Sequence, residues 1–454
     1  LLFIPERTNW QRPVADTLVS RTIVYDQVTR FHNHPSLAIW ANGNEGGFNF
    51  EVDELFTLLD LQDRPIIHPW ASFDGIDTKH YINYTDLKRR LAENSDILLP
   101  TELLHGLFDG GAGAGMDDYW DIMRTSELSA GGIVWCWADA AIERTDLNRN
   151  LDTDGNHSAD GIVGPYGEKE ASYYTLREIW SPLQIPLPNL PHDFIGQLPI
   201  ENRFYETSLS QCTFQWRLLS YNDPMSNSLS STETAKGNFK GPAIAPGATG
   251  SLHLPLPEDW KSSHTLEVTA KDPYDTELMT WSWSTGTQPS PIASAKVKLQ
   301  QDPDNPFKIQ LDDTTWTFSS ENGQLLSCIH DGNEIGLESG PTLYAGADKK
   351  NVSLTGIWTA KTYSKNGSVK VEGKSSDGSH YSWNLSPDGS VTLDYTFISI
   401  HEELTYCAIG FGLPESKVVS KRWSGDGPYR IWENRRKGPQ YGQWENEYND
   451  AIPG

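Results

Sequence analysis

The chain has 454 residues, of which 37% are hydrophobic, and its formal net charge is -25. It is too long for one hydrophobic core, so two to four domains are expected. No run of about 18 apolar residues occurs, which excludes a transmembrane helix. The negative charge argues against nucleic acid and anionic membranes as partners, because both bind clustered Lys and Arg.

Aromatic residues are abundant, with 17 Trp and 18 Tyr. Flat rings suit the apolar faces of sugars, but β-sandwich cores also use aromatics heavily, and composition alone leaves the two explanations equal. The 4 Cys contain no CxxC pair, so neither a zinc site nor a redox motif is expected. We expect no cofactor.

The first part of the chain alternates strand and helix signals. Apolar runs too short for helices are predicted as strands at 36–40, 65–68, 96–99 and 132–137. Amphipathic segments are predicted as helices at 14–30, 51–61, 84–94, 118–124 and 169–180. This alternation favours βαβ units and a parallel sheet. Since a complete (β/α)8 TIM barrel needs about 250 residues, residues 1–182 are predicted to be the C-terminal part of a TIM-barrel catalytic domain.

A Pro-rich stretch at 182–191 (PLQIPLPNLP) is predicted as an extended linker. After it, helix periodicity ends and alternating strands follow, so residues 193–286 are predicted to be an immunoglobulin-like β-sandwich. A second linker leads to a larger β-sandwich at 305–454, with hairpin turns at Asn322-Gly323 and Asp331-Gly332. The fold class is therefore multidomain α/β plus all-β.

Two glutamates follow predicted strands directly. Glu45 lies in the segment ANGNEGG after the first predicted strand, and Glu102 lies in LLPTELLHG after the third. Active sites of barrels are built at the C-terminal ends of the strands. Two carboxylates facing each other there suit glycoside hydrolysis, which needs one protonated and one ionised carboxyl group. For Glu45 alone, a structural role in capping the following helix is the alternative.

The segment RFHNHPSLAIWANGNE, which ends at Glu45, resembles the strand-4 signature of glycoside hydrolase family 2. Thr101-Glu102 resembles the nucleophile region of this family, and GGIVWCWAD at 131–139 resembles its strand-8 segment. The family contains β-galactosidases, β-glucuronidases and β-mannosidases. The resemblance extends over nearly the whole chain, including the two predicted sandwiches.

The resemblance implies a role for each of seven residues. Glu45 would be the acid/base and Glu102 the nucleophile. Asn44 would bind the 2-hydroxyl of the sugar, and Tyr81 would hydrogen-bond the nucleophile, with Tyr84 as a competing candidate. The remaining sugar contacts would come from His105, Trp135 and Asp160, although His105 and Trp135 also fit packed core positions.

Glu6 resembles an acid that helps bind Mg²⁺ in some family members. The histidine that joins it there is absent, because Arg7-Thr8-Asn9 follows. No metal is therefore expected. The chain also begins within a predicted strand, so we expect it to be an internal segment that lacks the first barrel strands and is poorly active alone.

The sequence thus predicts a retaining exo-β-glycosidase that hydrolyses terminal non-reducing β-D-galactosides, with carbohydrate as its partner. A β-glucuronidase or another family 2 hexosidase is one alternative, and a non-catalytic carbohydrate-binding fragment is another. The sequence leaves a homo-oligomer open. It does not fix the compartment, although a periplasmic or secreted location is preferred.

Overall fold

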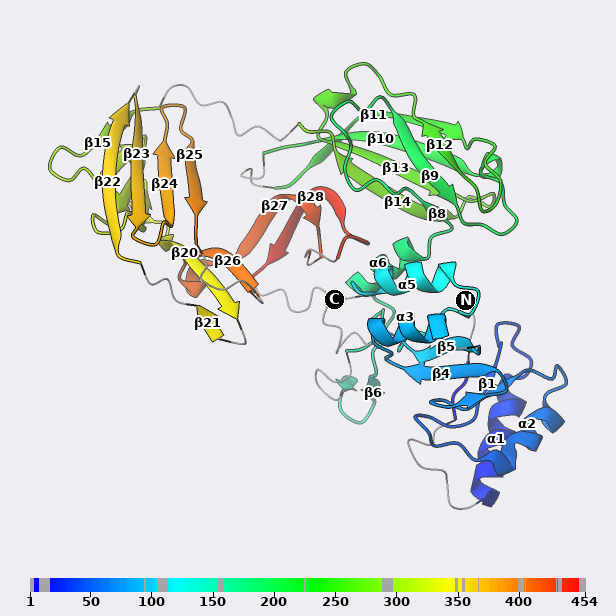
Figure 1. The fold of residues 1–454 in the computed structure, drawn as a ribbon. Helices are drawn as coiled ribbons and strands as arrows, with labels where there is room; N and C mark the ends of the chain where they lie inside the picture. Colours follow the sequence, from blue (N-terminus) through cyan, green and yellow to red (C-terminus); the bar gives the residue numbers. More distant parts are fainter. Residues whose placement is uncertain are drawn as a thin grey trace.

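A computed structural model gives the fold (Figure 1). It describes residues 4–7, 17–93, 95–103, 113–153, 159–223, 226, 228–287, 297–347, 350–352, 356–365, 367–398, 404, 406–429, 431 and 435–448. No helix in this described part of the chain has the length and apolar character to cross a membrane.

The N-terminal region, up to about residue 182, combines short strands with helices. Its helices are α1 (Thr17–Phe31), η1 (Phe50–Val52), α2 (Asp53–Leu59), α3 (Tyr84–Glu93), α5 (Met116–Thr125) and α6 (Ala171–Ile179). Its strands are β1 (Trp40–Ala41), β2 (Ile66–Ile67), β3 (Ser72–Phe73), β4 (Ile76–His80), β5 (Ile97–Glu102), β6 (Ile142–Arg144) and β7 (Asn150–Asp152). The five predicted helices are therefore present, within three residues at each end.

Parallel pairing dominates this region. Glu6 forms a parallel bridge with Ala41 at the end of β1, β1 pairs with β2, and β4 pairs with β5. Further parallel bridges join Leu103 to Val134 and Ala138 to Val163. The C-terminal ends of these segments consequently lie on one side, as in βαβ architecture.

A TIM barrel is not confirmed by these pairings. β1–β2 and β3–β4–β5 form separate small sheets in the described residues. The predicted strand at 132–137 is wrong: within the described part of the chain this segment makes one isolated bridge, Leu103 to Val134, and no continuous ladder. Its backbone instead bonds to several segments: Ile133 N–H donates to the carbonyl of Pro100, and Cys136 N–H donates to that of Asp160.

The second region is a β-sandwich, as predicted. One sheet has the order β11-β10-β13-β14 and the other the order β12-β9-β8. The strands are β8 (Leu183–Gln184), β9 (Gln197–Asn202), β10 (Thr213–Tyr221), β11 (Ser231–Lys240), β12 (Thr249–His253), β13 (Thr265–Lys271) and β14 (Glu277–Ser284), with short helices η3 (Leu209–Gln211) and η4 (Trp260–Ser262). β8 lies inside the predicted linker, so the sandwich begins earlier than predicted because Leu183 pairs with Asn202 and is fully buried.

The third region is also a β-sandwich. One sheet contains β15 (Leu299–Gln301), β16 (Lys308–Leu311), β17 (Thr314–Phe318), β18 (Leu325–His330), β19 (Asn333–Glu334), β20 (Glu338–Ala347), β21 (Lys350–Val352) and β26 (Tyr406–Gly412). The other contains β22 (Trp358–Lys365), β23 (Ser368–Ser375), β24 (His380–Leu385) and β25 (Val391–Thr396). The Asp331-Gly332 turn is confirmed: His330 pairs with Asn333, and both turn residues have positive φ.

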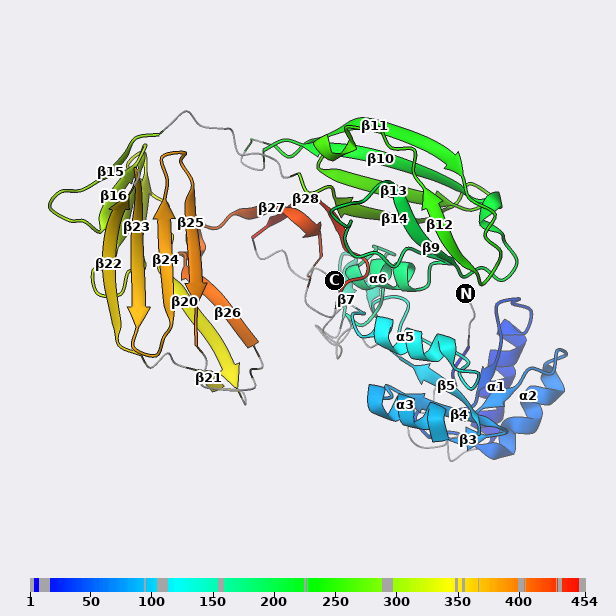
Figure 2. The ribbon, with the colours of Figure 1, turned by 45° about the horizontal axis from the view of Figure 1, so that its top comes forward.

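The last described strands do not belong to this sandwich. β27 (Ser420–Gly427) and β28 (Gln440–Glu447), which follow η5 (Glu415–Lys417), form a separate hairpin that lies between the two sandwiches in both views (Figures 1 and 2). Gln440 Nε2 donates to the carbonyl of Thr280, and Tyr441 N–H donates to Ser282 Oγ. The chain therefore returns to β14 of the second region.

Candidate active site

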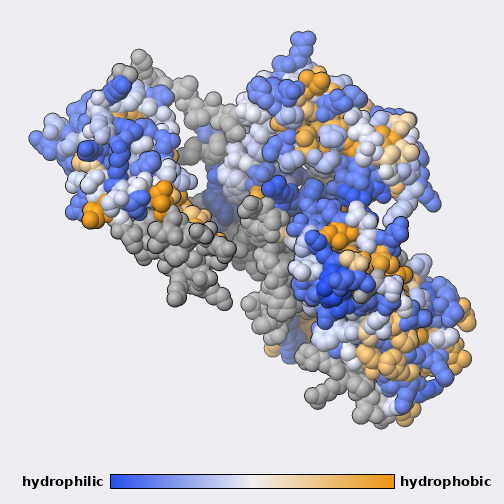
Figure 3. All heavy atoms as spheres, in the orientation of Figure 1, coloured by the Kyte–Doolittle hydropathy of each residue, from blue (hydrophilic) through white to orange (hydrophobic). Residues whose placement is uncertain are grey.

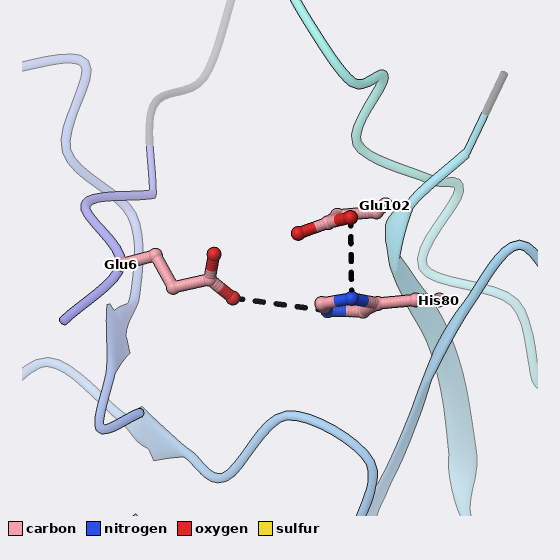
Figure 4. Close-up of side chains that lie close together, drawn as sticks. All are labelled: Glu6, His80 and Glu102. Atoms are coloured by element: carbon pink, nitrogen blue, oxygen red, sulfur yellow. Dashed lines mark ion pairs between the residues drawn. The ribbon is translucent and has the colours of Figure 1, made fainter. Parts of the chain in front are cut away.

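Two predicted site residues, Glu45 and Glu102, come together with Glu6 and His80 at the C-terminal ends of the parallel segments. Glu6 lies beside the end of β1, and Glu45 follows that strand. His80 and Glu102 are the last residues of β4 and β5, which pair with each other. Four segments thus place one side chain each around the same point, three of which appear in Figure 4.

His80 lies at the centre of this group. Its Nδ1 is 3.2 Å from Glu102 Oε2 and 3.5 Å from Glu45 Oε1, while its Nε2 is 3.7 Å from Glu6 Oε1. Because the Glu45 and Glu102 oxygens both lie within 3.5 Å of one nitrogen, they are separated by at most twice that distance, about 7 Å. This range includes the roughly 5–5.5 Å between the carboxyl groups of retaining glycosidases.

The loop that carries Glu45 is tightly built. Glu45 has φ 48°, a left-handed conformation that a non-glycine residue adopts at a cost of about 1–3 kcal/mol. Gly43 has φ 105°, and a Cβ there would lie 2.5 Å from the amide nitrogen of Phe48. The buried Arg7 donates from Nη2 to the carbonyl of Gly47. The loop conformation is therefore fixed from both ends.

Glu102 is 6% exposed and is held by Tyr81. The Tyr81 amide donates to the Glu102 carbonyl at 2.8 Å, and the two side chains are hydrogen-bonded. Burial, this hydrogen bond and the charges of Glu102, Glu45 and Asp160 raise the pKa of Tyr81 far above its ordinary value. The Tyr81 hydroxyl consequently keeps its proton and is the donor to the Glu102 carboxylate.

Tyr84, the competing candidate for this role, lies elsewhere. Its ring packs edge-on against Tyr119, with centroids 5.6 Å apart, and Lys88 Nζ lies 5.7 Å from its centroid. The structure therefore brings Tyr81, and not Tyr84, to the second glutamate.

Trp135 and Asp160 form a pair beside this cluster. Trp135 Nε1 donates to Asp160 Oδ2 at 3.0 Å, and Trp135 remains 37% exposed. Asp160 is buried, and the Gly161 that follows it has no room for a side chain, since a Cβ would lie 2.3 Å from the Asp139 nitrogen. Asp160 is therefore held against the backbone of 138–139, and the tryptophan ring is partly open to solvent.

Asn44 and His105 are the remaining predicted site residues. Asn44 immediately precedes Glu45, and its Oδ1 is buried without a hydrogen-bond partner in the described residues. Such an acceptor is available to a ligand hydroxyl. His105 lies outside the described residues.

The surroundings of Glu6 favour its protonated form. Burial, followed by the charges of Glu102 and Glu45, raises the pKa of Glu6 to about 8. His80, whose side chain is fully buried, is the basic group within ion-pair distance of all three glutamates.

His80 is the site residue that sequence reasoning missed. It ends the strand Ile76-Asp77-Thr78-Lys79-His80, which contains one apolar residue and was therefore not predicted as a strand. The adjacent Tyr81, already a candidate, was the available signal.

The expectation that the family histidine is absent concerned Arg7-Thr8-Asn9, which follow Glu6, whereas the structure brings a histidine from a different segment, His80, to within 3.7 Å of Glu6. Thr8 and Asn9, on which that expectation rested, lie outside the described residues. Glu6, His80 and Glu102 offer ligand atoms that all lie within 4.8 Å of one another. These residues could hold a metal ion.

Comparison with known proteins gives distant relatives. No family model matches the chain. It is 21% identical to a β-galactosidase of Oenococcus oeni over 94% of this chain and 47% of the relative. It is also 22% identical to a β-galactosidase of Leuconostoc mesenteroides, over 68% of this chain and 33% of the relative. The chain therefore spans about half the length of the first of these relatives and a third of the second.

Solved structures give weaker similarity. Amycolatopsis orientalis exo-chitosanase CsxA, in complex with PNP-β-D-glucosamine, is 9% identical with a TM-score of 0.28, covering 84% of this chain and 54% of that chain. A TM-score this low does not establish a shared fold. Both relatives found by sequence are named β-galactosidases.

Proposed function

We propose that this chain carries the catalytic residues of a retaining exo-β-glycosidase that releases terminal β-D-galactose from oligo- or polysaccharides. The supporting observation is that Glu45 and Glu102 lie within 3.5 Å of one His80 nitrogen, on the C-terminal side of parallel segments. Two carboxyl groups this close can act on a single anomeric carbon.

In the proposed reaction, Glu102 attacks the anomeric carbon and forms a glycosyl ester. Glu45 donates its proton to the glycosidic oxygen as that bond breaks, and the alcohol leaves. Glu45 then takes a proton from water, which displaces Glu102 and releases the sugar with its original configuration. The Tyr81 hydroxyl, as a donor to Glu102, orients the attacking carboxylate.

The sugar would be held by the residues around this pair. The exposed face of Trp135 offers a stacking surface, and its hydrogen bond to Asp160 fixes both side chains for contacts with the far hydroxyls. Asn44 would accept from the 2-hydroxyl, a contact that strengthens in the transition state. His105 is proposed as a further sugar contact.

Galactose is favoured among the sugars of this family by two observations. Two β-sandwiches follow the N-terminal region, an arrangement that β-glucuronidases generally lack, and the relatives are named β-galactosidases. We further propose that residues 1–182 are the later part of a TIM barrel. In this arrangement the parallel segments of Glu6, β1, β2, β4 and β5 would be successive barrel strands.

Hydrolysis and trapping test the proposal together. The chain, and any longer natural protein that contains it, is assayed on nitrophenyl β-galactoside, β-glucuronide and β-mannoside, with the first product anomer determined by NMR. A 2-deoxy-2-fluoro-β-galactoside with a good leaving group should label the peptide that contains Glu102. Preference for the glucuronide, release of the α anomer, a label on another residue, or no turnover by the longest form would each contradict the proposal.

A further inference from the structure

The side chains of Glu6, His80 and Glu102 surround a common space. One ligand atom from each lies within 4.8 Å of the others. Figure 4 shows Glu6 at one edge of the imidazole ring and Glu102 above its other nitrogen. The three residues come from three segments of the chain, so the fold itself creates this arrangement.

The histidine in this group is buried and unsatisfied. His80 is 4% exposed, and neither ring nitrogen makes a hydrogen bond in the described part of the chain. A buried polar group without a hydrogen bond destabilises the folded state. The imidazole nitrogens therefore lie near the glutamate oxygens without forming a hydrogen bond. A cation bound between the imidazole and the carboxylates would give a ring nitrogen a partner.

The donor atoms, one imidazole nitrogen and two carboxylate oxygens, indicate which class of cation fits this site. Mg²⁺ prefers oxygen donors and retains several waters, whereas Zn²⁺ and similar cations bind imidazole nitrogen together with carboxylate oxygen. Three protein ligands with one open position form the usual coordination shell of an accessible zinc ion.

We propose that a divalent transition-metal cation of the Zn²⁺ class binds to Glu6, His80 and Glu102, and that it inhibits the enzyme by occupying the carboxylate of Glu102. Binding of the cation follows from the geometry alone, while its inhibitory effect rests on the function proposed above. A cation bound to the Glu102 carboxylate withdraws its negative charge and obstructs the approach of the anomeric carbon, so the carboxylate becomes a poorer nucleophile.

Binding requires a modest closure of the site. Zinc bonds of about 2.0–2.2 Å place tetrahedral ligand atoms roughly 3.4 Å apart, so the most distant atoms must approach by about 1.5 Å. Rotation about the side-chain bonds of Glu6, which is only partly buried, can supply this movement. Glu45 Oε1, 3.5 Å from Nδ1, is placed to accept a hydrogen bond from the ring when Nε2 binds the metal.

The first experiment measures binding without turnover. The EDTA-treated 454-residue chain is titrated with ZnCl2 by calorimetry, and Co²⁺ is added to a second sample to record its visible absorption. We expect one tight site per chain. Loss of an outer hydrogen-bond partner of a metal ligand costs about 10–100-fold in affinity, so removing a ligand in His80→Ala or Glu6→Gln should cost at least about 100-fold.

A matched variant controls for adventitious histidine binding. His34 is exposed and distant in sequence from the cluster, so His34→Ala should leave the tight site unchanged. If His80→Ala misfolds, Glu6→Gln, a nearly isosteric change at a partly buried residue, still tests the site. Absence of a tight site, or unchanged affinity in folded Glu6→Gln, would overturn the inference.

The second experiment measures inhibition by Zn²⁺ in the active form of the protein, relative to the rate of each variant without metal. Reversal by EDTA in the wild type and loss of inhibition in Glu6→Gln are expected. Tight zinc binding without any glycosidase activity would leave the metal site standing and reject the proposed function. Turnover that zinc does not affect would reject inhibition at Glu102 while leaving the proposed function intact.

Discussion

The N-terminal region and the first sandwich are built in opposite ways. In the N-terminal region, β1 and β2 have 2 residues each, and its buried apolar residues divide into three clusters. In the sandwich, β13 and β14 have 7 and 8 residues, alternate between buried and less buried positions, and contribute to one large cluster. Figure 3 shows both hydrophilic and hydrophobic residues on the visible face of this sandwich.

Buried charge separates the two regions further. The sandwich from 183 to 286 buries polar but no charged residues among those described. The N-terminal region buries Arg7, Asp60, His68, Asp77, His80, Glu102, Asp160 and Glu178. Burying a charge is expensive unless it is paired. Asp60, Asp77 and Glu178 have Arg64, Arg90 and Lys437 as partners, whereas Glu6, Glu45 and Glu102 all lie near the one imidazole of His80.

Backbone strain follows the same division. The non-glycine residues with positive φ in the described part of the N-terminal region are Glu45, Asp63, Trp70, Asp74, Tyr81, Asn148 and Arg149. In the described part of the sandwich the only one is Asp275, in a turn where such a conformation is ordinary. Two of these seven residues, Glu45 and Tyr81, are candidate site residues, and strained backbone often occurs at such sites. The irregular region is thus the candidate for function and the regular one for stability.

The largest effect should come from removing the proposed nucleophile. Glu102→Gln keeps the shape of the side chain but eliminates its negative charge, so turnover should fall by at least about 10³-fold. The thermal transition should change little by comparison. Turnover is measured under saturating substrate by the active form of the protein, and a rate within tenfold of the wild type would contradict the assignment.

Loss of the proposed acid/base gives a complementary test. In Glu45→Ala, azide can enter the space left by the carboxylate and attack the glycosyl ester, so added azide should restore release of the sugar as a β-glycosyl azide. Glu102→Ala should instead give no β-azide. If the two variants respond identically, the roles of the two glutamates are not distinct.

The sandwich should respond to mutation in stability and not in chemistry. Leu266 is fully buried in β13 and pairs with Leu218 and Trp283, so Leu266→Ala should cost about 2–5 kcal/mol. Ile195, in the same region, is 85% exposed, and Ile195→Ala should stay within about 0.5 kcal/mol. Chemical denaturation measures stability, and equal kcat/KM for the folded fraction of both variants is expected.

Sequence alone predicted the sandwich better than the site. Alternation along segments such as Thr280–Trp283 determines which face of a strand is buried, so these strands were predictable from local pattern. The two glutamates were also predictable, because each directly follows an apolar run. His80 was not, because its strand is mostly polar, and its burial depends on contacts with Glu6 and Glu102 that are distant in the sequence.

The remaining misses have similar physical causes. The apolar run at 132–137 was predicted as a strand, but its partners come from several segments, and no single neighbour forms a ladder with it. The stretch that begins at Pro182 was predicted as a linker from its prolines, yet β8 within it completes a sheet with β9. In both cases tertiary pairing decides the outcome, and local pattern does not contain it.

The Glu45 loop offers a matched glycine pair. Gly43 and Gly46 both have positive φ, but only at Gly43 would a Cβ collide with backbone, 2.5 Å from the Phe48 nitrogen. Gly46→Ala should cost about 1–2 kcal/mol through its backbone conformation alone. Gly43→Ala should cost more, and it should lower kcat about tenfold or more by displacing Glu45, since small errors in position are costly. Equal effects on stability and kcat would show that the close approach is unimportant.

The smallest effect is a pH dependence of opposite sign at two carboxyl groups near helix α6. Burial, then the charge of Asp139 and its hydrogen bond, raises the pKa of Glu170 to about 7. The folded state therefore binds more protons than the unfolded state between about pH 4.5 and pH 7, and stability falls as pH rises through this window. Glu170→Gln removes the cost of ionising this buried carboxyl group. The Tm of the variant, relative to that of the wild type, should therefore rise between about pH 5 and pH 8.

Glu277 in the sandwich should behave differently. Burial raises its pKa, but hydrogen bonds from Arg177 and Thr280 outweigh burial and lower it. The stabilisation of the folded state by the ionised Glu277 side chain is therefore fully present above the ordinary glutamate pKa. It is lost only as pH falls through the lower pKa that Glu277 has in the folded state. Because the ion pair is partly exposed, Glu277→Gln should cost at most about 1 kcal/mol, by the same amount at about pH 5 and pH 8. If the Tm difference from wild type varies with pH in the same way for both variants, buried charge does not distinguish these two regions. If it varies with pH only for Glu170→Gln, the destabilising buried carboxyl group lies in the N-terminal region, which also contains the glutamate cluster.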